Sequence, residues 1–196
     1  MFHRTFIALD GNEAVRRRLI AMRSALQSAV GRGDRVNWVS PENFHVTLKF
    51  LGEVADVQLA EVCRVVQAVA AGAKPFDFAV GRLQLIPPAG RSLRMVWADV
   101  AGPDGRMAEL FERIEQALEP LGFPREHRPF SPHITLARVK YIRDAEALRV
   151  AAGKTPDDNE TLYAEHVTVY TSRLLKGGPV YTPAVRAQLR GDQLHS

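Results

Sequence analysis

The pattern of apolar and polar residues along this chain predicts short strands interleaved with four helices. Strands are predicted where apolar and polar side chains alternate, or where a short apolar run lies between turn residues. Helices are predicted where apolar residues recur every three or four positions, as they do in segment 104–118. The predicted strands are 2–9, 36–39, 44–51, 76–86, 93–100, 132–141, 162–171 and 179–189, and the predicted helices are 15–30, 56–71, 104–118 and 145–152.

The connections between these elements indicate how the strands pair. Several connections are short and rich in proline or glycine, such as 87–90 and 176–178, and turns of this kind join antiparallel strands. We therefore predict an α+β fold with antiparallel sheets and helices packed outside, and not a doubly wound parallel sheet. No linker rich in serine or glycine divides the sequence, so we expect a single domain over residues 1–196, made of two intimate lobes.

Composition and charge narrow the class of protein. Apolar residues make up 46% of the chain and charged residues 24%, which is typical of a soluble globular protein. Cys63 is the single cysteine and excludes an intramolecular disulfide. The N-terminus has no signal segment and no apolar run is long enough to cross a membrane, so we expect a cytoplasmic protein that binds no membrane. The net charge of +4 favours polyanionic partners, although arginines on helices also serve as a solvated face.

One tetrapeptide that contains a histidine and a threonine occurs twice with a single aliphatic exchange, as HVTL at 45–48 and HITL at 133–136. Side chains alternate between the two faces of a strand, so each histidine shares a face with the threonine two residues later. The aliphatic residues of each copy point to the other face and fit a core. If the two strands lie side by side about a pseudo-twofold axis, one cleft holds two imidazoles that titrate near neutrality and two hydroxyls. Such a set of groups suits phosphoryl chemistry.

A structural role and a metal site are the other interpretations of the histidine pair. A single histidine on a strand is more often a hydrogen-bonded structural residue than a catalyst, but two matched copies argue against coincidence. Neither copy has a second histidine, cysteine or carboxylate on the same face of the motif, whereas zinc needs three or four ligands. His127 is a further candidate ligand, but it lies in a loop rich in proline and arginine. Metal-free catalysis is therefore favoured over metal-dependent hydrolysis.

At this point the residues resemble a known family. The two motifs and their flanking segments are similar to those of the 2H phosphoesterases, and within them to the RNA 2′,3′-cyclic phosphodiesterases once described as 2′-5′ RNA ligases. The resemblance implies a bilobal α+β fold in which two antiparallel sheets face a central groove, each lobe contributing one motif. The segments that carry it are 6–9, 38–54, 96–98, 130–138 and 172–181.

The resemblance also implies roles for the four polar residues of the motifs. His45 is implied to be the general acid, or proton donor, and His133 the general base, or proton acceptor. Thr47 and Thr135 are implied to hydrogen-bond the substrate phosphate. The four residues stand unchanged at both motifs, so the resemblance implies a competent active site.

Two cationic residues near the motifs are further candidates for phosphate binding. Arg138 corresponds to the family's arginine after the second motif, although in an unbroken strand it would face away from His133. By strand alternation Lys49 shares the face of His45 and Thr47, so it either adds positive charge near the groove or lies as a solvated lysine at the rim.

The reaction that fits these groups is hydrolysis of an RNA 2′,3′-cyclic phosphate end to a 2′-phosphomonoester. A base takes the proton of water and an acid protonates the leaving ribose oxygen, so the scheme needs neither a metal nor another cofactor. The expected partner is RNA with such an end, or a small cyclic nucleotide, and the expected enzyme is a monomer. Two alternatives stay open: a 2′-5′ RNA ligase that runs the same chemistry in reverse on tRNA-like fragments, and a non-catalytic RNA-binding module.

Overall fold

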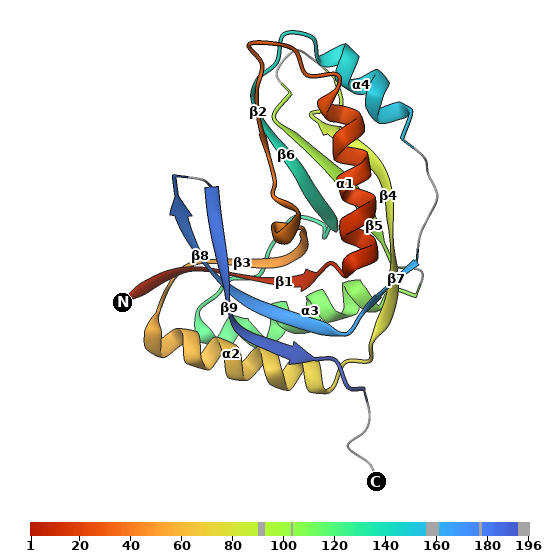
Figure 1. Ribbon diagram of the computed structural model, residues 1–196. Helices are drawn as coiled ribbons and strands as arrows, with labels where there is room; N and C mark the ends of the chain where they lie inside the picture. The colour runs from red at the N-terminus through yellow and green to blue at the C-terminus, as the bar shows by residue number, and fades with distance from the viewer. Residues whose placement is uncertain (90–92, 103, 156–160, 177, 192–196) are drawn as a thin grey trace.

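A computed structural model describes residues 1–89, 93–102, 104–155, 161–176 and 178–191 (Figure 1). These residues form an α+β fold, as predicted from the sequence. The strands are β1 (Phe2–Asp10), β2 (Arg35–Trp38), β3 (His45–Ala55), β4 (Phe76–Ile86), β5 (Met95–Ala101), β6 (His133–Tyr141), β7 (Thr161–Ala164), β8 (His166–Leu175) and β9 (Gly178–Gln188). The helices are α1 (Glu13–Gln27), α2 (Asp56–Ala71), α3 (Arg106–Leu118) and α4 (Ala145–Gly153), with short 3-10 helices η1 (Pro41–Asn43) and η2 (Glu119–Leu121).

Two of the helices, α1 and α4, begin at side-chain caps, and the helices bury their apolar stripes. The Asn12 side chain accepts a hydrogen bond from the Val15 N–H at the start of α1, and the Asp144 side chain caps α4 in the same way. On α3 the buried residues include the whole predicted apolar stripe, Met107, Leu110, Phe111, Ile114 and Leu118. Helical spacing of apolar residues therefore located these elements correctly.

The strands pair antiparallel in the order β7-β4-β5-β6-β3-β1-β8-β9, with β2 also paired to β6. This order divides the sheet into a β3 half (β1, β3, β8, β9) and a β6 half (β2, β4, β5, β6, β7). The halves are joined where Val46 of β3 pairs with Ile134 of β6. The predicted antiparallel sheets are thus present, and hydrogen bonding between β3 and β6 joins them into one curled sheet.

Helices cover one face of each half. Figure 1 shows α2 and α3 packed beneath the β3 half, while α1 and α4 pack against the β6 half. Val46 and Ile134 are buried toward these helices, whereas the residues on either side of them in β3 and β6 are partly exposed. We call the face of the sheet away from the helices the open face.

One predicted strand is wrong in its extent. Segment 162–171 was expected to be continuous, but it forms β7 and β8 with Glu165 between them. The reason is topological, because β7 pairs with β4 in the β6 half and β8 pairs with β1 in the β3 half. The apolar pattern continues through both strands, so it does not reveal the point at which the chain crosses between halves.

Among the helices of the described ranges, none is both long enough and apolar enough to cross a membrane.

Candidate active site

The two repeated motifs lie side by side at the junction between the halves of the sheet. Val46 and Ile134 are each 1% exposed and form the antiparallel pair of this junction. Continuing this register by one residue in each direction places His45 opposite Thr135 and Thr47 opposite His133. The histidine of each motif therefore lies beside the threonine of the other motif on the open face.

The two imidazoles are held by the same local hydrogen bond. Nδ1 of His45 lies 2.7 Å from the Asn43 carbonyl oxygen, and Nδ1 of His133 lies 2.8 Å from the Ser131 carbonyl oxygen. A carbonyl only accepts, so Nδ1 carries a proton in both rings and Nε2 is the nitrogen that gains or loses one. Each neutral ring is thus a base through Nε2, and each charged ring is an acid through the same atom.

Aromatic side chains pack against both rings. The ring centroids of Phe6 and His45 are 4.9 Å apart, and those of Trp97 and His133 are 4.1 Å apart. Tyr181 also meets His45 edge-on at 5.5 Å. Burial lowers the pKa of His45, while the hydrogen bond to the Asn43 carbonyl and the charge of Asp10 act in the opposite direction. The net fall in pKa favours the neutral form of His45.

A β-bulge follows the histidine and threonine in each motif strand. In β3, Thr47 pairs with Ala8 and Lys49 with Ile7, so Leu48 has no partner opposite it. In β6 Leu136 likewise has no partner opposite it. Each bulge turns two consecutive residues toward the core and reverses the alternation beyond it. The residues after the bulge therefore face the side opposite to the one that a regular strand predicts.

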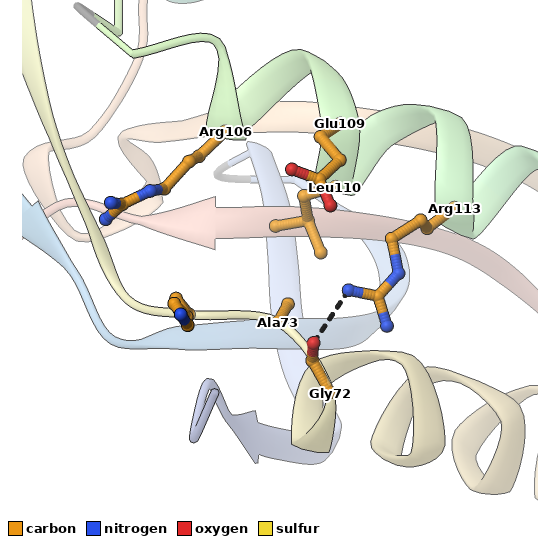
Figure 2. Close-up of a pocket in the computed structure, with 7 residues that line it drawn as sticks. Gly72, Ala73, Arg106, Glu109, Leu110 and Arg113 are labelled. Carbon is orange, nitrogen blue, oxygen red and sulfur yellow. Dashed lines mark hydrogen bonds between the residues drawn. The ribbon is translucent and has the colours of Figure 1, made fainter. Parts of the chain in front are cut away.

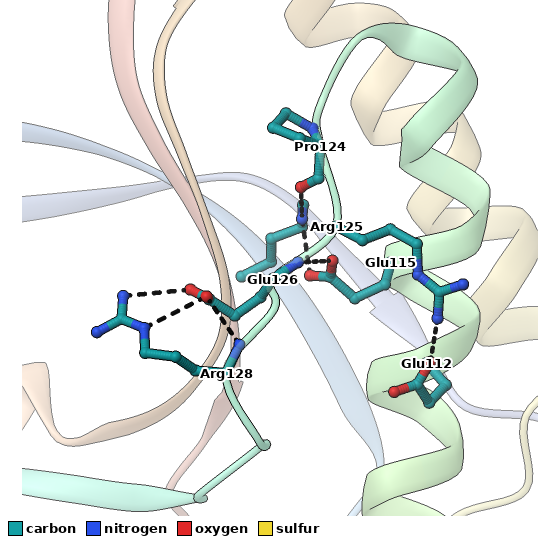
Figure 3. Close-up of polar contacts among 7 residues, drawn as sticks. Glu112, Glu115, Pro124, Arg125, Glu126 and Arg128 are labelled. Carbon is teal, nitrogen blue, oxygen red and sulfur yellow. Dashed lines mark hydrogen bonds and ion pairs between the residues drawn. The ribbon is translucent and has the colours of Figure 1, made fainter.

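Lys49 is the residue for which strand alternation gave the wrong face. It is only 6% exposed, and its Nζ lies 2.7 Å from Glu115 Oε1 and 2.8 Å from the Pro124 carbonyl. Figure 3 shows how Glu115 also accepts the backbone N–H of Glu126, at 2.8 Å. The ammonium group of Lys49 thus ties β3 to α3 and to the loop before the second motif, beneath the open face.

The bulge in β6 has the opposite effect on Arg138, whose side chain lies on the open face. The bulge at Leu136 puts its side chain on the same side of β6 as His133, and Nη1 lies 3.8 Å from Met95 Sδ. Burial raises the pKa of Tyr181, and the nearby charges of Arg138 and Arg4 partly oppose that rise. The orientation conflict expected for Arg138 from an unbroken strand is therefore absent, and its charge acts on Tyr181, whose ring meets His45.

The sequence patterns missed two carboxylates on the open face. Asp10 of β1 pairs directly with His45, and Asp99 of β5 pairs directly with His133. Asp10 accepts hydrogen bonds from the hydroxyls of Tyr170, at 2.6 Å, and Thr168, at 2.8 Å. The one available signal was positional, because Asp10 places a charge directly after the first predicted strand, 2–9.

Of two pockets in the structure, one is lined by some of these residues and the other is lined by different ones. A pocket of about 260 Å³ is lined in part by Asp10, Tyr170 and Arg186 and so lies beside His45. A second pocket of about 270 Å³ lies at the end of α2 (Figure 2). There Arg113 donates to the Gly72 carbonyl at 2.8 Å and caps the last turn of α2, which is a structural role.

Within the described ranges, no group of three or more histidine, cysteine, aspartate or glutamate residues has the arrangement needed to hold a metal ion.

The matched histidines lie on two adjoining strands, an arrangement that suits phosphoryl chemistry, and comparison with known proteins gives the class of a phosphoesterase. A family model described as LigT-like phosphoesterase matches residues 9–97 and 100–181, which include both motifs. The chain belongs to the LigT-like phosphoesterase family, and it is an enzyme of the phosphodiesterase class. The family resemblance seen in the sequence is confirmed.

Individual relatives extend over most of the chain. An RNA 2′,3′-cyclic phosphodiesterase of Thermotoga maritima is 32% identical over 188 residues, covering 96% of each chain. One from Methanothermobacter thermautotrophicus is 31% identical over 180 residues, covering 91% of this chain and 95% of its own. Among solved structures, a protein of Thermus thermophilus superposes with a TM-score of 0.81 at 27% identity, over 96% of this chain and 99% of its own.

Proposed function

We propose that this enzyme hydrolyses RNA 2′,3′-cyclic phosphate ends to 2′-phosphomonoesters through His45 and His133. The observation that carries the proposal is the matched hydrogen bonding of the two rings, which leaves both Nε2 atoms to exchange protons on one face. Relatives that share more than 90% of the chain's length are RNA 2′,3′-cyclic phosphodiesterases, which supports the choice of substrate.

The proposed step is an in-line displacement at phosphorus. His133 Nε2 accepts a proton from water as its oxygen bonds to phosphorus, and the bond from phosphorus to the 3′ oxygen breaks. His45 Nε2 donates its proton to that oxygen, which leaves a 2′-phosphate and a 3′-hydroxyl. A strained cyclic diester is already reactive, so the protein needs mainly to position it and to stabilise charge on the non-bridging oxygens.

Hydroxyl and cationic donors supply that stabilisation in the proposal. Thr47 and Thr135 flank the two histidines on the open face and donate to the non-bridging oxygens. Arg138 reaches the same face through the bulge at Leu136 and adds a full positive charge. Lys49 is left out of this set because its ammonium group is bonded to Glu115.

The direct test is incubation of the purified protein with an oligonucleotide that ends in a 2′,3′-cyclic phosphate. We expect a 2′-phosphate product whether or not a second oligonucleotide with a 5′-hydroxyl is present. Joined product as the main species would instead identify a ligase, and binding with no chemical change would identify an RNA-binding module.

Replacing Thr47 or Thr135 by valine tests the phosphate-binding role of the hydroxyls. Valine keeps the shape and removes the donor, so kcat/KM should fall by about tenfold to a hundredfold, the value of a hydrogen bond to a charged group. Thermal unfolding measured on the same samples supplies the control. The threonines are structural if both variants lose stability in proportion to activity.

A substrate with sulfur in place of the 3′ oxygen separates the roles of the two histidines. Sulfur leaves readily without a proton, whereas water must still be activated. The thio substrate should therefore restore turnover of His45→Ala toward the wild-type rate and leave His133→Ala slow. Rescue of the His133 variant alone would mean that acid and base are exchanged.

A further inference from the structure

The pseudo-twofold arrangement of the site extends beyond the two motifs to a pair of carboxylates. Asp10 pairs with His45 across β1 and β3, and Asp99 pairs with His133 across β5 and β6. Directly opposed residues of antiparallel strands share a face, with Cβ atoms about 5 Å apart. Each histidine therefore has a carboxylate beside it on the side away from the other motif.

Each carboxylate also holds the aromatic residues that pack on its histidine. Asp10 Oδ1 accepts the Tyr170 hydroxyl at 2.6 Å, Tyr170 stacks on Phe6 at 5.3 Å between centroids, and Phe6 packs on His45. On the other side, Asp99 accepts the Trp97 Nε1–H at 3.2 Å, and Trp97 packs on His133.

The two carboxylates differ in the groups that fix them. Asp99 accepts a second hydrogen bond from Gln84 Nε2, at 2.7 Å, so its partners are neutral. Asp10 lies 3.5 Å from the Arg186 Nε, in addition to its two hydroxyl donors, and is 21% exposed. These partners hold both carboxylates in place. The carboxylates are not needed to orient the imidazole rings, because Nδ1 of each ring already donates to a backbone carbonyl.

The charged and titratable groups around His45 come from four strands. β1 contributes Asp10, β6 contributes His133 and Arg138, β8 contributes Tyr170, and β9 contributes Tyr181 and Arg186. Burial, followed by the adjacent Asp10 carboxylate, raises the pKa of Tyr170, so that this residue stays neutral. Glu42 of η1 and Arg16 of α1 line the pocket beside Asp10 as well. Asp10 is the acidic group whose charge opposes the effect of burial on His45.

We propose that Asp10 is a positioning residue that favours the protonated, proton-donating form of His45 against the effect of burial, and that Asp99 is its positional counterpart, which holds Trp97 against His133. The inference rests on the proposed function for its catalytic meaning, because a general acid must carry its proton when the substrate binds. The carboxylate opposes the fall in the pKa of His45 that burial causes, and this favours the acid role of the ring. Asp10 acts through its field and through the aromatic residues that it holds, without touching the substrate.

The test is the replacement of Asp10 by asparagine, followed by NMR titration of protein labelled at histidine Cε1. Asparagine keeps the shape and an acceptor for Tyr170 but removes the charge. The pKa of His45 should fall by about half to one pH unit, the size expected for a charge at this distance in a partly screened site. The alkaline limb of kcat/KM should move down by the same amount, giving a loss of about threefold to tenfold above neutrality and little loss at low pH.

Two matched variants test the sign of the shift in the pKa of His45 and whether the shift depends on Asp10 alone. Arg186→Gln removes the cation that partly neutralises Asp10, so it should raise the pKa of His45. Asp99→Asn, which removes the other carboxylate, should leave the titration curve of His45 in place. A His45 curve that is the same in the wild type and in Asp10→Asn would overturn the inference, as would equal activity loss at every pH. A shifted curve in a protein with no phosphodiesterase activity would sustain the inference about Asp10 and reject the proposed function.

Discussion

Replacement of His133 by alanine is expected to lower kcat/KM by about 10²–10⁴-fold, the usual contribution of a general base. His45→Ala should cause a loss of the same order, because proton transfer to the leaving oxygen is as necessary as activation of water. Both rings lie on the open face, so the fold should survive, and circular dichroism spectra should match that of the wild type. Initial rates on a cyclic-phosphate oligonucleotide measure the loss.

His127→Ala is the matched control for these variants. This histidine lies six positions before His133, is exposed, and was the one further metal-ligand candidate in the sequence. Its replacement should leave the rate unchanged. Activity near the wild-type level in a folded His45 or His133 variant would rule out the two-histidine mechanism.

Replacement of Lys49 by methionine is expected to lower the free energy of unfolding by about 3–5 kcal/mol. Methionine fills the space of the lysine stem but leaves the carboxylate of Glu115, a residue only 1% exposed, without its cation. For a chain of this size the melting temperature should fall by about 6–20 °C. Urea unfolding followed by fluorescence gives the free energy directly.

The double variant Lys49→Met/Glu115→Leu separates the ion pair from the packing. With both charges removed, most of the lost stability should return, because a buried pair is often matched by apolar residues of similar volume. The two effects would be additive if no direct interaction joined the side chains. A loss below about 1 kcal/mol in the single variant would show that Lys49 reaches water in solution.

The two-residue period of strands was enough to predict the core of the site. It placed His45 with Thr47 and His133 with Thr135, and it turned Val46 and Ile134 toward the core, as the structure has them. Apolar spacing likewise located the helices. These features follow from the sequence because each depends on residues that are neighbours along the chain.

The face of every residue beyond the motifs could not be predicted in this way. The bulges at Leu48 and Leu136 depend on how β3 and β6 align with β1 and β5, which no local pattern records. They send Lys49 inward and Arg138 outward, the reverse of the simple alternation.

The two carboxylates beside the histidines could not be predicted from a local sequence pattern either. Asp10 and Asp99 lie far from the motifs in sequence, and only the pairing of β1 with β3 and of β5 with β6 places them beside the histidines. Tyr170 of β8 and Gln84 of β4, which donate hydrogen bonds to them, come from two further strands. A search for polar residues that end an apolar strand would have singled out Asp10.

The fixed orientation of the two rings has a consequence for how the enzyme returns to its starting state. In the proposed cycle, one turnover leaves His45 deprotonated and His133 protonated, the inverse of the state that began it. Neither ring can turn over to present its other nitrogen without breaking the hydrogen bond to Asn43 or Ser131. Both protons must then exchange with solvent through Nε2, the atoms that the bound product covers. Recovery of the enzyme is therefore coupled to departure of the product, and a product that lingers delays both.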